Sequence, residues 1–363
     1  MSEQKFYHLK IREVRENTPE AKTVVLEIPD ELKPQFQYKA GQYITVEVEI
    51  AGDKVRRSYS LSSAPHEEEF AFTVKKVDGG KVSPFLTGDL NSTDSLKVSS
   101  PEGRFTMEFL PEKKRSHYFL AAGSGVTPVI SLIKTCLEEE PMSEVFLLYS
   151  NRNPQSVIFQ EELDDLVSRH QGQFFMNKTF TRTGQGVFSR LFGKGNKTSD
   201  QWTGRIDEKM IDRFMEAHPG TKKEKHFYIC GPGAMIKKAV KHLEGQGHDS
   251  GYIHKEYFTV DDADKKVVSA IDGAKVRVEL HGEWIEINVP AGKSILSKLQ
   301  DEGYDPPYSC TSGVCSSCMA KLISGKVEME TCLALDDSEV VEGFILTCQA
   351  KPVTDKVELT YEV

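Results

Sequence analysis

Four cysteines near the end of the chain constrain its fold more than any other feature. Cys310, Cys315 and Cys318 lie within the nine residues CTSGVCSSC, and Cys348 follows after 29 intervening residues. Zinc sites usually take their ligands from two close pairs, whereas here only Cys315 and Cys318 form such a pair. Two irons that share two sulfides need thiolates from opposite sides, which one loop and a distant segment can supply. A zinc site or free thiols are the alternatives.

The stretch around these cysteines, PPYSCTSGVCSSCMAKLISG, closely resembles plant-type [2Fe–2S] ferredoxins around their cluster. The spacing C-x4-C-x2-C with a distant fourth cysteine is typical of that class. Gly313 permits tight wrapping of the loop, and small Ser and Thr residues let backbone amides reach the sulfurs. The resemblance implies an α+β β-grasp domain whose cluster ligands are Cys310, Cys315, Cys318 and Cys348. Cys332 does not fit the spacing, and we interpret it as a packed or partly exposed thiol.

Length and composition indicate a multidomain protein. A chain of 363 residues has room for two or three domains, and 38% hydrophobic and 28% charged residues are typical of globular proteins. No apolar run has the length of a membrane span, and the N-terminus MSEQKFYHLK lacks the apolar core of a signal peptide. Seven cysteines in so long a chain do not indicate a secreted disulfide framework. We therefore expect a cytoplasmic protein with reduced thiols and no membrane insertion.

The net charge of −9 is concentrated in the last quarter of the chain. From Asp272 onward there are 16 acidic and 8 basic side chains, a balance of −8. Such an acidic module suits a basic protein partner and disfavours nucleic acid, whose phosphates would repel it. An acidic surface that only aids solubility is the alternative.

Hydrophobic patterning divides the chain into three domains and a linker. Residues 1–112 alternate short apolar and polar stretches such as TVVLEI and YITVEVEI, which predicts an antiparallel β-barrel. Residues 113–260 alternate apolar strands such as HYFLAAG and VFLLYS with helical patterns, which predicts an α/β domain with a parallel sheet. Residues 261–271, which include DDADKK, form the predicted linker. Residues 272–363 begin with a hairpin and a short helix and end in the ferredoxin-like segment.

The first domain carries motifs that resemble the ferredoxin reductase-like flavoproteins. RRSYSLSS contains the R-x-Y-S pattern of that family, which places a cation on the pyrophosphate, a ring on the flavin and a hydroxyl beside its reactive nitrogen. FTVKKVDGGKVSPFL resembles the second flavin segment, and SPEGRF resembles the turn that closes such barrels. An ordinary surface strand is the alternative for R-x-Y-S alone. By this resemblance the FAD-binding residues are Arg57, Tyr59, Ser60, Thr73, Val74, Lys75, Gly80, Lys81, Val82 and Ser83.

YFLAAGSGVTPVISLIK predicts a strand, a glycine turn and a helix that bind a nicotinamide dinucleotide. Gly123 and Gly125 allow a pyrophosphate to approach closely. We predict Thr127 as the N-cap and Pro128 as the first helical residue, where no N–H is needed. The turn reads G-x-G-x-x-P and so departs from the dinucleotide fingerprint G-x-G-x-x-G, but it resembles the reductase family at this position.

Two later segments also resemble that family around its redox centre. In YICGPGAM, the resemblance places Cys230, Gly231 and Pro232 beside the nicotinamide and facing the flavin. A buried small hydrophobe is the alternative for Cys230. HKEYF resembles the family's Glu-x-aromatic pair, which we assign to Glu256 and Phe258. The residues that the resemblance implies at the catalytic centre are Tyr59, Ser60 and Cys230.

The sequence favours NADPH over NADH as the electron donor. The predicted second strand of the α/β domain ends in YSNRN, without the carboxylate that binds the ribose hydroxyls of NADH. Thr181 and Arg182 lie where NADPH-dependent relatives carry a hydroxyl–arginine pair for the 2′-phosphate. Arg152 and Arg182 can equally be solvated surface residues, so NADH stays open. The basic, glycine-rich insertion 184–197 is either a loop near this site or a disordered segment.

The order of a flavin barrel, a nicotinamide domain and a C-terminal ferredoxin resembles the reductase components of multicomponent oxygenases. The tail KVEMETCLALDDSEVVEGFILTCQA most resembles the reductase subunits of phenylacetyl-CoA epoxidases. The resemblance implies electron flow from NADPH through FAD and a [2Fe–2S] cluster to a terminal oxygenase, a di-iron epoxidase, which docks on the acidic ferredoxin domain. A reductase for a Rieske-type hydroxylase or a lipid desaturase is one alternative. A non-enzymatic iron–sulfur electron carrier is another.

Overall fold

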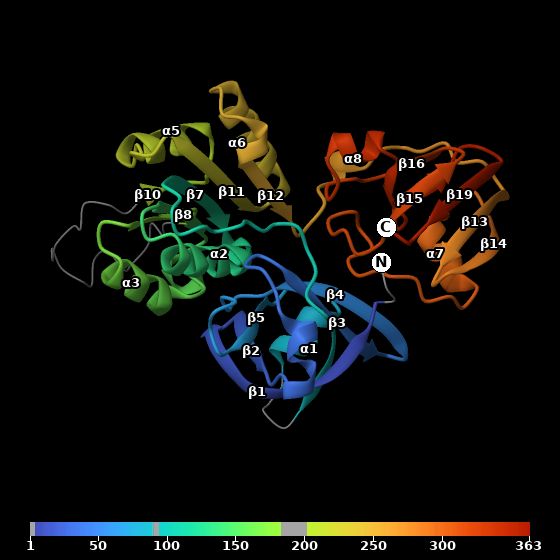
Figure 1. Ribbon diagram of the computed structural model, residues 1–363, viewed down its shortest axis with the longest axis horizontal. Coiled ribbons are helices and arrows are strands. Elements are labelled where there is room, and N and C mark those ends of the chain that lie inside the picture. The colour runs from blue at the N-terminus through green and yellow to red at the C-terminus, as the bar shows by residue number, and fades with distance from the viewer. Residues whose placement is uncertain (1–3, 89, 91–93, 183–201) are drawn as a thin grey trace.

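The computed structural model describes residues 4–88, 90, 94–182 and 202–363, so the insertion 184–197 lies outside the described residues. Figure 1 shows three lobes, each built around a sheet of its own. The N-terminal lobe lies below the other two, and the C-terminal lobe lies at the right of the view (Figure 1). The predicted multidomain fold of a barrel, a parallel α/β sheet and a ferredoxin-like domain is confirmed. Among the described residues, no helix combines the length and apolar character of a membrane span.

The N-terminal lobe is an antiparallel barrel. Its six strands follow the order β4-β3-β6-β1-β2-β5, and a bridge between Leu61 and Phe72 joins the two ends of that order. Alternate side chains of each strand fill the barrel, because successive residues of a strand point to opposite faces. The strands are β1 (Phe6–Thr18), β2 (Ala21–Leu26), β3 (Tyr43–Ile50), β4 (Asp53–Ser60), β5 (Phe70–Lys75) and β6 (Ser95–Ser99), and the one α-helix in the described part of this lobe is α1 (Val82–Thr87).

The second lobe is a parallel sheet with helices on both faces. The strand order is β10-β9-β8-β7-β11-β12, and all neighbouring strands are parallel. The chain adds strands on one side of β7 first and on the other side afterwards, so β7 and β11 flank a topological switch point. The carboxyl ends of the strands beside such a point form a ligand-binding crevice. Side chains of α2 and α3 fill one face of the sheet, and those of α5 and α6 fill the other. The elements are β7 (Arg115–Ala122), α2 (Val126–Glu139), β8 (Glu144–Asn151), α3 (Gln160–Arg169), β9 (Phe174–Phe180), β10 (Trp202–Thr203), α5 (Glu208–Ala217), β11 (Glu224–Gly231), α6 (Gly233–Gly245) and β12 (Ile253–Tyr257).

The predicted start of α2 is wrong by two residues. Gly123–Gly125 form a 3-10 turn that runs directly into the helix, so Gly125 is the N-cap residue and Val126 the first helical residue. Thr127 and Pro128 therefore occupy the second and third helical positions. The Thr127 hydroxyl donates a hydrogen bond to the Ser124 carbonyl at 3.0 Å, where a capping side chain would accept one from a backbone amide.

The third lobe is a mixed sheet with one helix against it. The order β14-β13-β19-β15-β17 contains one parallel pair, β13 with β19. The predicted hairpin is present, and His281 and Gly282 turn it with φ of 56° and 78°, as a two-residue hairpin turn requires. The elements are β13 (Ala274–Leu280), β14 (Glu283–Val289), α7 (Ile295–Asp301), β15 (Met319–Ser324), β16 (Val327–Met329), α8 (Asp337–Val341), β17 (Phe344–Leu346), β18 (Ala350–Pro352) and β19 (Lys356–Thr360).

An extended segment connects the second and third lobes. Residues 258–273 leave β12 and reach β13, and backbone bonds from Lys266 to Glu330 and from Ile271 to Pro352 hold part of this segment along the ferredoxin lobe. The predicted linker 261–271 falls within it. The exact domain boundaries, 1–112, 113–260 and 272–363, stay predictions.

Candidate redox site

The four predicted cluster cysteines meet at one edge of the ferredoxin lobe. The sulfur of Cys315 lies 3.0 Å from that of Cys310, and Cys348 is within hydrogen-bonding reach of both Cys310 and Cys318. None of the four forms a disulfide. Hydrogen bonds from Cys315 and Cys348 hold the pKa of the Cys310 thiol well below its usual range. One loop and a strand-end segment thus supply convergent thiols, one of which is readily ionised.

Backbone and amide donors complete this thiol group. The Ser312 N–H lies 3.4 Å from the Cys310 sulfur, and Gln349 Nε2 lies 3.7 Å from the Cys348 sulfur. Gly313 has a φ of 78°, and a Cβ there would stand 2.6 Å from the Thr331 carbonyl oxygen, so only glycine allows the loop to fold so tightly. Thiolates surrounded by N–H donors are what an iron–sulfur cluster needs. The described residues therefore fit a [2Fe–2S] cluster.

Cys332 lies beside this group without belonging to the predicted ligand set. It packs, half-buried, against the apolar residues that also surround Cys318 and Cys348, and burial raises the pKa of its thiol. Its assignment as a packed thiol stays a prediction.

The R-x-Y-S segment lies on β4, on the side of the barrel that faces the other two lobes (Figure 1). Arg57 and Tyr59 are half-buried, and the Tyr59 ring lies 5.6 Å from that of Phe72. Burial raises the pKa of the Tyr59 hydroxyl, which therefore stays protonated. Ser60, at the end of the strand, is buried.

Ser60 meets the predicted Glu-x-aromatic pair of the second lobe. Its Oγ lies 3.4 Å from a carboxylate oxygen of Glu256 on β12. Glu256 is half-buried, and desolvation raises the pKa of its carboxyl to about 8, against the opposing effect of the Ser60 hydrogen bond. In the parallel pairing of β11 with β12, Glu256 is opposite Cys230. Three residues predicted from separate motifs therefore lie together.

The second flavin segment divides between two faces of β5. Val74 points into the barrel core, so only its backbone is open to a cofactor. Thr73 points to the other face, where its hydroxyl is bonded to those of Thr23 and Ser62 at 2.7 and 2.9 Å. Lys75 continues that face and lines a pocket shared with the parallel sheet, and burial together with nearby Arg152 lowers its pKa.

The predicted pyrophosphate contact is the start of α1. Lys81 is the N-cap residue, and the first-turn residues Val82 and Ser83 are buried. Val82 packs in the barrel core, and the Ser83 hydroxyl accepts a bond from the Val77 amide at 3.0 Å. The groups left for a ligand are thus the backbone amides that follow Gly80, as the resemblance implies.

A pocket of about 690 Å³ opens at the switch point of the parallel sheet. Its walls come from the ends of β7, β8 and β11, from the start of α6 and from β5 of the barrel. Predicted site residues that line it are Lys75, Gly123, Gly125, Thr181, Gly231, Pro232 and Phe258. Thr127 and Arg182 are not among its lining residues.

Backbone packing explains the glycine turn of this pocket. A Cβ on Gly125 would stand 2.1 Å from the Cys230 carbonyl oxygen, so the turn after β7 packs directly on the end of β11. Gly123 has a φ of 56°, which glycine adopts without strain. Cys230 itself is fully buried, and desolvation raises the pKa of its thiol. The strand ends on either side of the switch point are thereby fixed against each other.

The sequence did not predict two further cations of this pocket, and it left a third undecided. Arg205 and Lys238 line it, as does Arg152, which the sequence left open as a surface residue. Arg152 follows β8 directly, where a dinucleotide-binding fold contacts the ribose. Arg205 and Lys238 belong to no motif, so no local signal marks them.

A smaller pocket of about 180 Å³ lies where the three lobes meet. Tyr43 and Phe105 of the barrel, Glu256 of β12 and Cys315 of the cysteine loop all line it. Residues of the barrel, of β12 and of the cysteine loop therefore share the walls of this one pocket.

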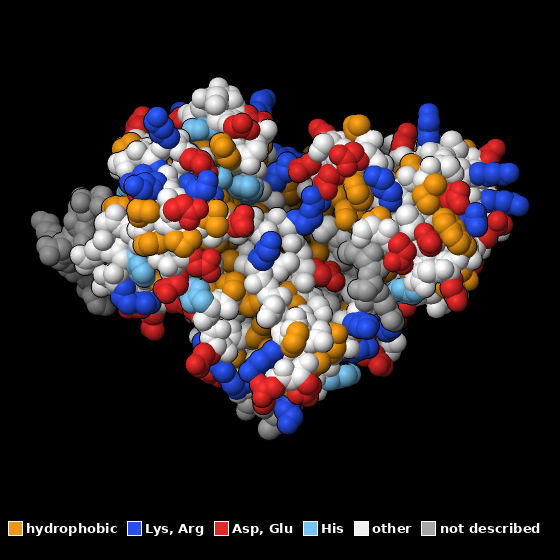
Figure 2. All heavy atoms as spheres, viewed as in Figure 1, with side chains coloured by type: hydrophobic (Ala, Val, Ile, Leu, Met, Phe, Trp, Pro, Cys, Tyr) orange, Lys and Arg blue, Asp and Glu red, His pale blue; other side chains and the backbone are white. Residues whose placement is uncertain are grey.

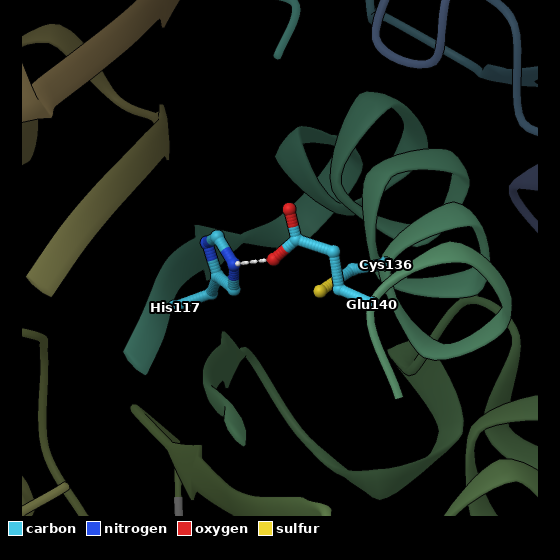
Figure 3. A group of neighbouring side chains, drawn as sticks. All are labelled: His117, Cys136 and Glu140. Atoms are coloured by element: carbon cyan, nitrogen blue, oxygen red, sulfur yellow. Dashed lines mark hydrogen bonds and ion pairs between the residues drawn. The ribbon is translucent and has the colours of Figure 1, made fainter. Parts of the chain in front are cut away.

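A further group of polar residues lies buried in the second lobe, away from this site. Figure 3 shows His117 of β7 pointing to Glu140, at the end of α2, with Cys136 beside it. His117 Nε2 lies 3.0 Å from Glu140, whose carboxylate also binds Arg115, the Ser143 hydroxyl and the Leu110 amide. Both carboxylate oxygens are thus occupied. The group ties the segment that follows the barrel to the parallel sheet.

Comparison with known families divides the chain in the same way as its sheets. Residues 8–107 match the oxidoreductase FAD-binding domain, residues 119–241 the oxidoreductase NAD-binding domain, and residues 278–353 the 2Fe-2S iron-sulfur cluster binding domain. FAD, a nicotinamide dinucleotide and a [2Fe–2S] cluster are therefore the cofactors of this architecture, as predicted.

Similar proteins share the whole arrangement. The chain is 31% identical over 360 residues to a component of the 1,2-phenylacetyl-CoA epoxidase of Escherichia coli, with 98% of each chain covered. It is 33% identical over 368 residues to the ferredoxin reductase component of 3-ketosteroid-9-alpha-monooxygenase of Rhodococcus rhodochrous, with 97% of this chain and 96% of that one covered. The solved structure of phthalate dioxygenase reductase matches 98% of both chains with a TM-score of 0.57 and 25% identity.

Proposed function

This chain belongs to the family of oxygenase reductases that carry FAD-, NAD- and [2Fe–2S]-binding domains, and we propose that it passes electrons from NADPH to a di-iron phenylacetyl-CoA epoxidase. It is an oxidoreductase, the reductase component of an oxygenase system. The proposal covers the choice of NADPH over NADH, the epoxidase as partner, the surface on which it docks and the residue roles given below.

When bound, the dinucleotide supplies a hydride, FAD accepts its two electrons and releases them singly, and the cluster carries one at a time. The protein binds and orients these groups. Arg57 and the amides that follow Gly80 hold the FAD pyrophosphate. Tyr59 and Ser60 would contact the flavin ring, and Cys230 and Glu256 would lie beside them, where the nicotinamide would enter. This arrangement is supported by the contact of Ser60 with Glu256 and by the pairing of Glu256 with Cys230.

The charge of the pocket at the switch point, where we place the nicotinamide dinucleotide, supports NADPH as the electron donor. Lys75, Arg152, Arg205 and Lys238 line it, whereas Asp207 is the one acidic side chain among its described lining residues. The Asp207 carboxylate is engaged, because it caps α5 by accepting the Met210 amide at 2.9 Å. A 2′-phosphate would gain charge-assisted hydrogen bonds from such cations. Thr181 and Arg182 stay candidates for the same phosphate, Thr181 from the pocket wall.

We choose the epoxidase as partner because the chain is similar to the E. coli epoxidase component over 98% of both chains. A monooxygenase of the ketosteroid type is the second candidate, because that reductase is 33% identical over a similar length. Purified oxygenase components of each system should be combined with this protein, FAD and NADPH. The proposal requires product from phenylacetyl-CoA at a rate at least about tenfold above that with the ketosteroid system. A faster rate with the ketosteroid system would instead identify that monooxygenase as the partner.

We propose that the partner docks on the ferredoxin lobe around α8. Figure 2 shows acidic side chains gathered over this part of the lobe. Asp337 lies at the start of α8, and its neighbours Asp336 and Glu339 pair with Lys255 and Arg104 of this chain. Leu335, one residue before Asp336, packs against Cys318 and Cys348, so this surface adjoins the cluster. Val341, between Glu339 and Glu342 in the chain, is 87% exposed and offers an apolar contact.

Matched charge reversals test this surface. Glu342→Lys, next to α8, should slow electron delivery to the oxygenase about fivefold at low salt, because electrostatic attraction speeds encounter. Glu283→Lys is the control, since Glu283 is equally exposed but lies on β14 at the far side of the lobe (Figure 1). Equal rates of electron delivery in the two variants would show that the partner docks on another surface.

A further inference from the structure

Two uncharged hydrogen bonds join the barrel to the two ends of the cysteine loop. The Ser58 hydroxyl donates to the Ser309 hydroxyl at 2.7 Å, and the hydroxyls of Tyr43 and Ser317 lie 2.9 Å apart. Ser309 comes directly before Cys310, and Ser317 directly before Cys318. The loop that carries three of the four thiols is therefore attached to the barrel beside its first and its last cysteine.

On the barrel side, both bonds start from the hairpin that carries the flavin motif. In the pairing of β3 with β4, Tyr43 is opposite Ser60 and Thr45 is opposite Ser58. Ser58 lies between Arg57 and Tyr59 in the chain. A single pair of strands thus presents the residues proposed to bind the flavin and the hydroxyls that hold the cysteine loop.

The Tyr43 side chain is fixed on all sides. It is 5% exposed, and a Cβ on Gly103 would stand 2.8 Å from its ring, so the glycine makes room for it. Its backbone exchanges two hydrogen bonds with that of Glu102, at 2.7 and 2.8 Å. The Glu102 carboxylate in turn lies 3.3 Å from the Ser317 hydroxyl. Rigid groups of this kind position a neighbour more precisely than flexible surface side chains do.

Charged pairs surround these two bonds but contact other parts of the ferredoxin lobe. Arg56 pairs with Asp305 at 2.9 Å, Arg104 pairs with Glu339, and Lys255 pairs with Asp336 at 3.7 Å. At least one partner of each pair is exposed, and exposed ion pairs contribute little to binding and weaken in salt. They hold the lobe as a whole, whereas the hydroxyl pairs reach the residues next to the cluster ligands.

We propose that Tyr43 and Ser58 are positioning residues that hold the cysteine loop against the flavin strands and set the rate of electron transfer between them. This rests on the proposed route from flavin to cluster. The step moves one electron from the reduced flavin to the oxidised cluster, and no bond forms or breaks. Hydride from the dinucleotide supplies two electrons, so two such steps complete each cycle. Because the rate depends steeply on placement, small shifts of the loop slow the step.

The test uses Tyr43→Phe, Ser58→Ala and the double variant in the full chain loaded with FAD and cluster. Both changes leave the sequence of the cysteine loop intact. After anaerobic mixing with NADPH, cluster absorbance should follow flavin reduction about fivefold more slowly in each single variant and about 20-fold more slowly in the double variant. The rate of flavin reduction itself should stay the same. Hydrogen exchange of residues 305–320 should rise, which reports the position of the loop without any turnover.

Tyr38→Phe is the matched control. Tyr38 also makes a tyrosine–serine bond, to the Ser63 hydroxyl at 2.8 Å, but within the barrel. It should change neither the transfer rate nor the exchange of the loop. If the double variant retains its flavin and iron and transfers electrons within about twofold of the unaltered protein, the positioning role is wrong. If NADPH fails to reduce the cluster of the unaltered protein, the proposed function itself is wrong.

Discussion

The hydroxyl of Ser60 lies 3.4 Å from a carboxylate oxygen of Glu256, although 196 residues separate them in the chain. The contact joins the end of the flavin strand to the last strand of the parallel sheet. Desolvation raises the pKa of the Glu256 carboxyl to about 8, so at pH 7 the site holds a neutral acid. With FAD bound in the proposed site, hydride uptake would add negative charge to the flavin, and a neutral Glu256 would oppose this less than a carboxylate would.

Glu256 should therefore give flavin reduction a pH dependence. As pH rises through about 8 the carboxyl ionises. The rate of flavin reduction by NADPH should then fall about fivefold, because a carboxylate repels the developing charge. Glu256→Gln should keep the rate near its low-pH value across this range. Stopped-flow flavin absorbance between pH 6 and 9.5 measures both profiles, and a variant that still shows the fall would assign it to another group.

Cys315→Ser should separate the two halves of the electron route. Without this thiolate the cluster should be lost, so transfer to one-electron protein acceptors should stop, while NADPH oxidation by ferricyanide-type dyes continues from the flavin. Iron content, the visible spectrum and both assays on one preparation check this. Cys332→Ser is the matched control and should retain iron and transfer. Unaltered transfer to a protein partner in Cys315→Ser would contradict the route.

Local motifs were enough to predict the three folds and the segments that come together at the candidate site. The thiol spacing, the glycine turn after β7 and the segment YICGPG each occupy one short stretch whose backbone shape the sequence nearly dictates. Period-two alternation also indicates which residues of β5 share a face. It places Val74 in the core although it belongs to the flavin motif.

Contacts between domains could not be predicted in this way. Tyr43 belongs to no motif, and although Ser317 lies within the cysteine motif, nothing in that motif indicates a contact with a residue 274 positions away. Arg56 belongs to no predicted site, and the structure buries it between Glu47 and Asp305. The start of α2 was misplaced because a 3-10 turn extends the helix beyond the residue that looks like a cap. The contacts of Tyr43, Ser317 and Arg56 depend on how the lobes pack, and the start of α2 depends on how the glycine turn packs on the end of β11.

Arg152 should contribute to the choice of NADPH. It lines the pocket directly after β8, so Arg152→Ala should lower kcat/KM for NADPH about tenfold and leave that for NADH within about twofold. Arg182→Ala tests the residue favoured by the sequence. Arg169→Ala is the control, because Arg169 is an exposed arginine paired with Asp165 on α3. Initial rates with a dye acceptor measure all three. Equal losses for both dinucleotides in Arg152→Ala would indicate contact with a group that they share.

Three histidines across β7, β11 and β12 should make the fold sensitive to acid. His117 and His226 have ring centroids 5.6 Å apart, and His226 and His254 have facing ring nitrogens 3.5 Å apart. Burial lowers the pKa of each, to about 4 for His254, and Arg115 lowers those of His117 and His226 further. The unfolded chain takes up protons near the ordinary value of about 6.5, so stability is full above that pH and is lost as pH falls below it.

The free energy of unfolding should therefore decrease by about 1 kcal/mol for each of these histidines between pH 7 and 5. His254→Gln removes one titrating ring at the edge of the group and should reduce this slope. His66→Gln is the control, because His66 lies in the barrel, outside this group. Urea unfolding at pH 7, 6 and 5 gives the slopes. If His254→Gln loses as much stability on acidification as the unaltered protein, protonation of His254 does not drive the loss.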